Sequence, residues 1–479
     1  PAYIRGTVTL APSTPPTAAA RPAGADLTRS LGLFRATAMV VGTIIGASIF
    51  VQPSVVTRHV PTVAGAFAAW AVAGALTLFG ALACAELASA FPKSGGVYVF
   101  LKEAFSPALG FLWGWAMFWS MHSGIVAAIS VVLGRYVAYF VPLGTAGTRA
   151  VAIAAILALS AVNYRGVRHG SALQTALTVA KVGAIIAIVA VGFALGPRVA
   201  ATAGLAHAPS AAGALAAASG AAHGGAAAAT LGVATLRGFF LAVAAGLFAF
   251  GGWHMVTYTA EETLAPERTI PRALLIGTLA VTACYVALNS VYFHVLPVDT
   301  VRSSTRVAAD AADAVLGSGG GAVMAAVVVL STLGALSGII LTGPRVYYAM
   351  ARDGLLFRWL GEVHPRFHTP HRAVALQAVW SSVLVGTGTY EALFSRVVYT
   401  EWIFFALMAV GLVLLRRRAH YAPRFTVWGF PVTPALFALA SLAVAVNQIA
   451  TAPRESLSGL ALVVLGLPIY FAWSTYARR

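Results

Sequence analysis

The sequence predicts an all-α integral membrane protein with twelve transmembrane helices. Of its 479 residues, 59% are hydrophobic and only 9% are charged, and the mean hydropathy is +0.84. Soluble domains carry about 25% charged residues. The composition therefore excludes an ordinary soluble enzyme, a disordered chain and a nucleic-acid-binding module, despite an isoelectric point near 10.5. A spanning helix needs about 20 apolar residues, so the chain can supply about a dozen.

Apolar stretches separated by Gly, Pro and Arg mark the twelve expected spans. The third is overlong and the fourth is short. In chain order they cover roughly 33–57, 61–90, 105–140, 148–163, 171–196, 236–262, 271–296, 321–350, 372–390, 397–415, 432–450 and 457–477.

The distribution of Lys and Arg predicts the orientation. With the N-terminus inside, 21 of the 31 basic residues fall on the cytoplasmic side and nine fall outside, with Lys181 left within a span. This bias predicts a multi-pass protein of the cell inner (plasma) membrane with both termini in the cytoplasm. The alternative, a basic surface for nucleic acid or anionic lipid, is disfavoured because no single loop is dense enough in charge.

The spans suggest a division into two blocks of five, followed by two extra helices. The expected parts are a disordered cytoplasmic tail (1–29), a first inverted repeat (30–196), an Ala/Gly-rich extracellular loop (197–235), a second inverted repeat (236–415) and a C-terminal part (416–479). His207 and His223 in the loop are expected to be solvated. Cys84 and Cys284 lie in apolar runs without metal-ligand spacing, so neither a metal nor a cofactor is expected.

Two spans carry small residues where an apolar helix should continue. The first contains the run from Gly42 to Phe50, and the sixth contains the run from Phe248 to His254. Interrupted helices in matching positions of two repeats indicate a transporter with its site at the bilayer midplane. Unwinding frees N–H groups, which suit a carboxylate, and carbonyls, which suit an ammonium, so a zwitterion satisfies both. The alternative, glycines that permit close helix packing, explains one break more easily than two.

Ionisable residues within the spans refine this hypothesis. Nearly all acidic residues fall in loops or at span ends, with Glu401 about one turn inside its span, so no carboxylate is expected at the middle of the membrane. This favours neutral substrates. Lys181 lies roughly 15 Å into the fifth span, too deep for its side chain to reach the surface. We expect its ammonium to replace a sodium ion.

The expected partners of Lys181 are carbonyls of the first span and a hydroxyl of the eighth span, from Ser331, Thr332 or Ser337. His254 follows the second break and is a candidate ligand. His122 is expected to be a packing residue. Phe248 and Phe250 flank the break and are expected to cap a ligand as a thin gate.

Several motifs together resemble the amino acid–polyamine–organocation superfamily, and specifically its L-amino acid transporter branch. The resemblance covers about residues 30 to 477. It rests on the runs 42–50, 85–87, 91–98, 248–254, 261–262, 270–273, 345–354, 364–367 and 369–370.

The resemblance implies a LeuT-like fold with alternating access. It implies that Gly46, Ala47 and Ser48 hold the substrate carboxylate, that Ile44, Phe248 and Gly251 offer carbonyls to the amine, and that Lys181 takes the sodium position of sodium-independent members. Two residues depart from the family pattern: Ser48 stands where a glycine is common, and His254 where the closest branch has Asn. No Cys lies outside the membrane, so no disulfide-linked accessory subunit is expected.

These observations predict a sodium-independent transporter of small to medium neutral L-amino acids, working as an exchanger. The alternative is a proton-coupled symporter that titrates Lys181 or His254. A membrane-embedded hydrolase or transferase is disfavoured, because no nucleophile clusters with a base and no acid is expected near His122 or His254. A passive channel is disfavoured because the two breaks suit a binding site better than a continuous pore.

Overall fold

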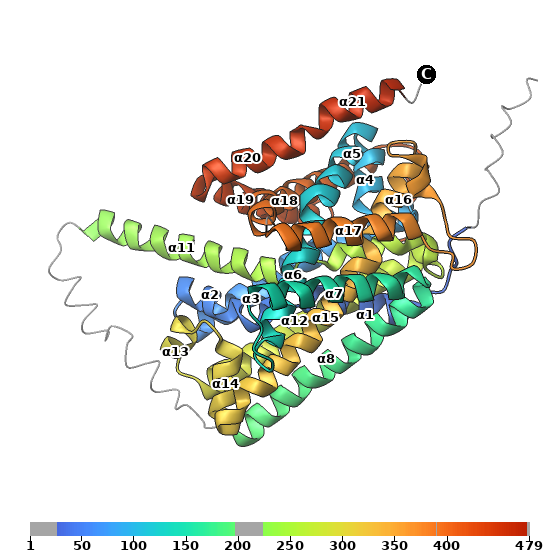
Figure 1. Ribbon diagram of the computed structural model, residues 1–479. Helices are drawn as coiled ribbons and strands as arrows, with labels where there is room; N and C mark the ends of the chain where they lie inside the picture. Colours follow the sequence, from blue (N-terminus) through green and yellow to red (C-terminus); the bar gives the residue numbers. More distant parts are fainter. Residues whose placement is uncertain (1–25, 197–223, 389, 477–479) are drawn as a thin grey trace, which may run out of the picture.

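The computed structural model describes residues 26–196, 224–388 and 390–476 (Figure 1). The predictions for residues 1–25, for His207 and His223, and for most of the 197–235 loop lie outside these residues. Within the described part, every regular element is a helix, and the one isolated β-bridge joins Leu31 to Thr263.

The first half of the chain forms helices close to the expected spans. They are α1 (Leu33–Ile44), η1 (Ser48–Phe50), α2 (Gln52–His59), α3 (Val63–Ala90), α4 (Val97–Ala104), α5 (Pro107–Ala116), η2 (Met117–Met121), α6 (His122–Val137), α7 (Thr145–Tyr164) and α8 (Val167–Leu195).

The second half begins with α11 (Gly224–Ala249) and η3 (Trp253–Glu262). It continues with α12 (Pro266–Val295), α13 (Val298–Ser303), α14 (Val307–Leu316), η4 (Gly317–Gly319), α15 (Gly320–Thr342), α16 (Pro344–Arg352), η5 (Arg358–Gly361), α17 (His371–Thr387), α18 (Tyr390–Leu415), α19 (Val432–Thr451), α20 (Pro453–Val464) and α21 (Gly466–Tyr476).

Nine helical segments of the described residues are long and apolar enough to cross a membrane. Two shorter apolar stretches, Leu33–Ile44 and Tyr399–Leu415, accompany them. The prediction of a multi-pass membrane protein is confirmed at this level. The overlong third span is one helical path, α5 to α6, with a π-helical turn at η2, where one extra residue per turn disturbs the regular ladder.

Two helices begin earlier than the sequence indicated. α11 begins at Gly224, within the stretch assigned to the loop, because its first residues are mostly alanine, the strongest helix former. Its first half extends away from the other helices in Figure 1. α18 begins at Tyr390 and not at 397, which adds about two turns before the expected start of that span.

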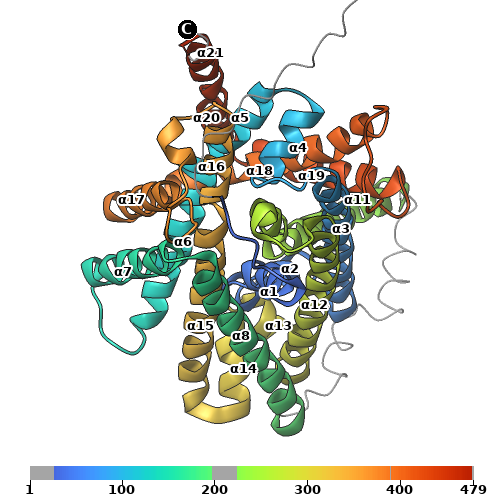
Figure 2. The same cartoon turned by 90° about the vertical axis from the view of Figure 1, so that its right-hand side faces the viewer.

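The helices of the first and sixth spans meet at the centre of the bundle. α1 packs against α8, α12, α15 and η3. In Figure 2, α8 and α15 lie together on one side of α1, and α12 lies beside α3 on the other. The interior between these helices therefore receives residues that lie far apart in the sequence.

Candidate functional site

The first span is interrupted at the small residues that follow Ile44. α1 ends at Ile44, Ile45 takes an extended conformation (ψ 95°), and a short 3₁₀ turn begins only at Ser48. The N–H of Ile45 still bonds the carbonyl of Val41, but Gly46 and Ala47 lie outside both helices. Their peptide groups are exposed to a partner other than the helix itself.

The second interruption follows Ala249, where Gly252 turns the chain. Gly252 has φ +104°, a left-handed conformation that glycine adopts without strain. A Cβ at this position would also lie only 2.9 Å from the carbonyl oxygen of Thr43. Glycine is therefore required both for the turn and for the close approach of the two breaks.

Direct hydrogen bonds join the two interruptions. The hydroxyl of Thr43 lies 3.2 Å from the carbonyl oxygen of Gly252 while also bonding Met39 one turn back. The hydroxyl of Tyr285, on α12, donates to the carbonyls that end the two half-helices, at 2.9 Å from Ala249 and 3.3 Å from Ile44. The two breaks are therefore in direct contact. Carbonyl groups from both also bond the same side chain, Tyr285 of α12.

Lys181 reaches the first break from α8. Its Nζ donates to three carbonyl oxygens: Gly42 at 3.0 Å, Ile45 at 2.7 Å and Ser331 at 3.0 Å. The side chain is completely buried. All three ammonium protons are therefore matched with acceptors, two of which lie at the C-terminal end of α1, where a helix carries partial negative charge.

The eighth span contributes differently from the expectation that one of its hydroxyls bonds the ammonium. Lys181 uses the backbone carbonyl of Ser331, whose hydroxyl instead donates to Gly46 at 3.1 Å and Ile45 at 3.3 Å. The hydroxyl of Thr332 bonds back to Val328 within its own helix. Ser337 is buried, and its hydroxyl makes no hydrogen bond among the described residues. Of the three expected residues of the eighth span, Ser331 is the one that contacts both the ammonium and the first break.

A methyl group fits without a clash at one glycine of each break. A Cβ on Gly46 would meet nothing nearer than Ala335 at 3.9 Å, and one on Gly251 nothing nearer than the Phe248 carbonyl at 3.5 Å. By contrast, a Cβ on Gly42 would lie 2.1 Å from Gln174. Ala47 and Ser48 are partly accessible, and Gly251 is exposed. Freed peptide groups therefore occur beside glycines that tolerate a small added group.

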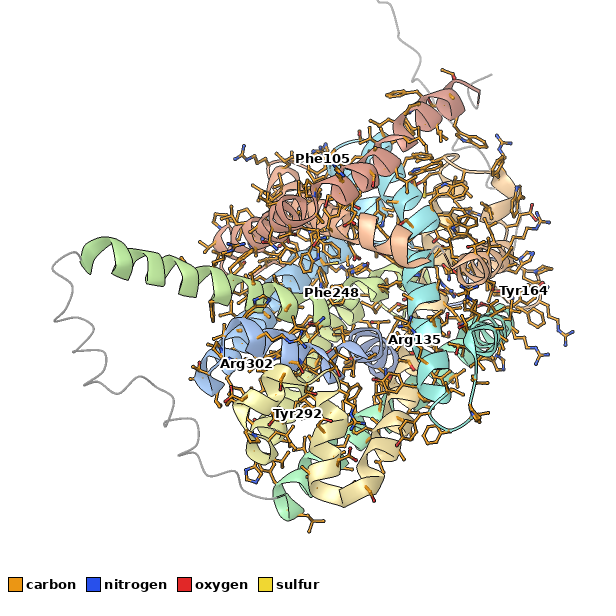
Figure 3. All side chains as sticks on the ribbon, turned by 60° about the vertical axis from the view of Figure 1, so that its left-hand side comes forward. Phe105, Arg135, Tyr164, Phe248, Tyr292 and Arg302 are labelled. Carbon is orange, nitrogen blue, oxygen red and sulfur yellow. The ribbon has the colours of Figure 1, made fainter. Side chains whose placement is uncertain are left out.

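The two phenylalanines beside the second break have different surroundings. Phe248 is 46% exposed and lies at the inner end of α11 (Figure 3). Phe250 is buried, with its ring 4.9 Å from Tyr285 and 6.3 Å from Trp70 between centroids. Of the pair expected to form a thin gate, only Phe248 is accessible to a ligand in this arrangement.

The acidic residue that the sequence places near a span end lies beside the residue that follows the second break. Because α18 begins at Tyr390, Glu401 lies about three turns inside the helix, and its Oε1 is 3.5 Å from Nε2 of His254. The expectation that His254 lacks a nearby acid is wrong for the same reason. His122 has its own partner, since its Nε2–H lies 2.9 Å from the Ile339 carbonyl.

The described residues contain no group of three His, Cys, Asp or Glu side chains that could hold a metal ion. Cys84 and Cys284 are both free. The arrangement therefore offers backbone donors and acceptors, one ammonium and one carboxylate–imidazole pair. It is suited to binding a small charged molecule.

The amino acid permease family model matches residues 31–471. The chain belongs to the amino acid permease family. This membership confirms the resemblance to the amino acid–polyamine–organocation superfamily, and it confirms the prediction of a transporter and not an enzyme.

Individual relatives match over nearly their whole length. The serine/threonine exchanger SteT of Bacillus subtilis is 29% identical over 449 residues, which cover 93% of this chain and 97% of SteT. The human b(0,+)-type amino acid transporter 1 is 30% identical over 460 residues (95% and 90%). The human cystine/glutamate transporter is 28% identical over 459 residues (95% and 87%). This permease is therefore similar throughout to amino acid transporters.

Two residues of the site could not be assigned their contacts from the sequence. Tyr285 is a polar residue within an apolar span, but nothing in the sequence shows that its hydroxyl reaches both breaks. Glu401 was visible as an acidic residue and was placed too near a span end. Its depth could have been found by extending the helix back through the residues before 397.

Proposed function

We propose that this permease is a sodium-independent exchanger of small to medium neutral L-amino acids. The observation that carries the proposal is the ammonium of Lys181, bonded to the carbonyls of Gly42, Ile45 and Ser331. When protonated, it supplies a positive charge at the end of α1. A cation held in this way makes a bound sodium ion unnecessary for stabilising the unwound segment.

The substrate's charged groups would complete the two breaks. We assign its carboxylate to the backbone N–H groups of Gly46, Ala47 and Ser48, and its amine to carbonyls at the second break, with Gly251 the most accessible. The Ile44 carbonyl already accepts a hydrogen bond from Tyr285, and the Phe248 carbonyl accepts one from the Gly251 N–H. Each would bond the substrate amine through its second lone pair.

The protein would work by alternating access. We propose that the chain has twelve spans. Spans one to five and six to ten would form the inverted repeats of a LeuT-like fold, and spans eleven and twelve would be added after them. The first, second, sixth and seventh spans would rock against the remaining helices. Both termini are assigned to the cytoplasmic side of the cell inner (plasma) membrane, in line with the distribution of basic residues.

The substrate class rests on similarity to SteT. Glu401 removes the original argument for neutral substrates. The near full-length match to a serine/threonine exchanger supports small neutral amino acids instead. Both cysteines lie within helices, which agrees with a chain that works without a disulfide-linked accessory subunit.

Counterflow in proteoliposomes tests the proposal. We expect uptake of a labelled amino acid to require unlabelled amino acid inside, and to be unchanged when sodium is replaced by choline. Uptake driven by a pH gradient into empty vesicles would instead support the alternative, a proton-coupled symporter that titrates His254 or Lys181. Dependence on sodium would overturn the assigned role of Lys181.

A further inference from the structure

Glu401 is an acidic residue near the middle of a membrane-spanning helix. It lies 11 residues after Tyr390, the first residue of α18, which corresponds to about 16 Å along the helix axis. Ionisable side chains within a spanning helix are costly and almost always face a partner or a water-filled space inside the protein. The contacts of Glu401 identify which of these it faces.

The carboxylate of Glu401 points towards the protein interior. Its Oε1 lies 3.5 Å from Nε2 of His254, a residue that is completely buried. The side chain of Glu401 nevertheless remains 19% exposed. Glu401 therefore faces a buried ring, while part of its side chain remains accessible.

His254 does not satisfy the hydrogen-bonding capacity of this carboxylate. A separation of 3.5 Å exceeds the 2.7–3.2 Å of a protein hydrogen bond. Neither ring nitrogen of His254 makes a hydrogen bond among the described residues. The pair therefore presents unused acceptor and donor capacity inside the membrane, where each unpaired polar group has a free-energy cost.

Aromatic side chains hold the imidazole in place. Its centroid lies 4.8 Å from that of Phe405 and 5.5 Å from those of Trp253 and Tyr258, with Trp113 at 6.0 Å. The position of the imidazole is therefore set by contacts with these four rings.

The same contacts place Glu401 beside the second break. His254 follows Gly251 by three residues, and Gly251 is exposed. Phe405, one helical turn after Glu401, packs with its ring 5.2 Å from that of Trp253. An amino acid held at the breaks reaches Glu401 if its side chain extends towards α18.

We propose that Glu401 is a specificity-determining residue whose carboxylate accepts a hydrogen bond from a hydroxyl or amide on the substrate's side chain. This inference rests on the proposed function, because it requires an amino acid at the breaks. An apolar side chain of the same size leaves the carboxylate unsatisfied. An acidic side chain brings a second negative charge close to the first.

Threonine and valine test the proposal because they differ mainly by a hydroxyl in place of a methyl. The experiment measures inhibition of counterflow in proteoliposomes by threonine, valine, asparagine, leucine and aspartate. It compares the wild type with Glu401→Gln and Glu401→Leu. Glu455→Gln is the matched control, since Glu455 is an exposed carboxylate at the start of α20.

We expect the wild type to prefer threonine to valine by roughly tenfold to a hundredfold, the range expected for a hydrogen bond to a charged group. Glu401→Leu should abolish this preference. Glu401→Gln keeps a carbonyl acceptor, so it should retain part of the preference while admitting aspartate. Glu455→Gln should match the wild type.

Three outcomes would overturn the inference. They are a wild type that does not distinguish threonine from valine, a Glu401→Leu variant that still prefers threonine, and a Glu401→Gln variant that changes only thermal stability. The last would indicate a purely structural carboxylate. If Glu401→Leu does not fold, the aspartate result for Glu401→Gln decides. Absence of counterflow with every amino acid in the wild type would contradict the proposed function itself.

Discussion

The ammonium of Lys181 lies 2.7 Å from the carbonyl oxygen of Ile45, the residue that follows the last turn of α1. Lys181 belongs to α8, so this contact ties the fifth span to the unwound part of the first. Ser331 adds α15 to the same point through its hydroxyl and its carbonyl. Lys181 of α8 and Ser331 of α15 therefore together satisfy the freed carbonyls of the first break.

Lys181→Ala should leave the protein folded and reduce transport at least tenfold, equivalent to about 1.4 kcal/mol in the transport barrier. The variant leaves the Gly42 and Ile45 carbonyls without their cation, which loosens the first span against the eighth. Counterflow rate and size-exclusion profile are the measurements. Lys93→Ala is the control, because Lys93 is exposed. Wild-type rates in Lys181→Ala would remove Lys181 from the mechanism.

A bulky residue at Gly46 should abolish substrate binding. The effect should depend on the size of the new side chain, because a Cβ at this position meets only Ala335, at 3.9 Å. Gly46→Ala should therefore fold and bind weakly, while Gly46→Leu fills the space assigned to the carboxylate. Substrate-induced thermal shifts measure binding, since a ligand that binds only the folded state raises its apparent stability. Unchanged affinity in Gly46→Leu would contradict the carboxylate placement.

Tyr285→Phe tests the bridge between the two breaks. The variant keeps the ring packing against Phe250 and removes the hydroxyl that bonds the Ala249 and Ile44 carbonyls. We expect a loss of about 1–3 kcal/mol in stability, because buried carbonyls are left unsatisfied, together with slower counterflow. Tyr139→Phe, at an exposed tyrosine, is the control. If both variants behaved alike, the bridge would have no energetic role.

A buried ion pair closes the end of the bundle at which α1 begins. Arg345 of α16 forms two hydrogen bonds with the Glu262 carboxylate, at 2.6 and 2.8 Å, and both side chains are almost fully buried. The backbone carbonyl of Glu262 also accepts hydrogen bonds from the N–H groups of Ser30 and Leu31. The segment before α1 is thereby fixed to η3 and α16.

Glu262→Gln should lower the free energy of unfolding by about 3–5 kcal/mol, because it leaves a buried guanidinium unpaired. Glu362→Gln is the comparison, since the Glu362–Arg372 pair is 2.8 Å long but about half exposed, and its loss should cost less than about 1 kcal/mol. Apparent melting temperatures in one detergent distinguish the two. Equal shifts would mean that burial does not set the strength of the first pair.

Much of the fold follows from residues that can be read directly. The small residues from Gly42 to Ser48 and from Ala249 to Gly252 predicted interruptions in the first and sixth spans, and the structure has both. Lys181 was predicted to meet carbonyls of the first span, and it does so. These predictions succeeded because glycine pairs and a buried charge are both unfavourable in an apolar spanning helix, so each indicates a local departure from a regular helix.

What the sequence did not reveal depends on tertiary packing. The sequence predicts that the tenth span begins at 397, whereas α18 begins at Tyr390, so Glu401 lies further inside the helix than expected. The choice of the Ser331 carbonyl over a hydroxyl is set by the register of α15 against α1. Whether the Tyr285 hydroxyl contacts both breaks depends likewise on the rotation of α12 about its axis.

The central claim is that an amino acid's head group completes the peptide groups at the two breaks. An experimental structure with a transported amino acid bound tests it most directly. We predict density for the carboxylate at the N–H groups of Gly46 and Ala47 and for the amine beside Gly251. Density elsewhere in the protein, or continuous helices through both breaks, would contradict the account.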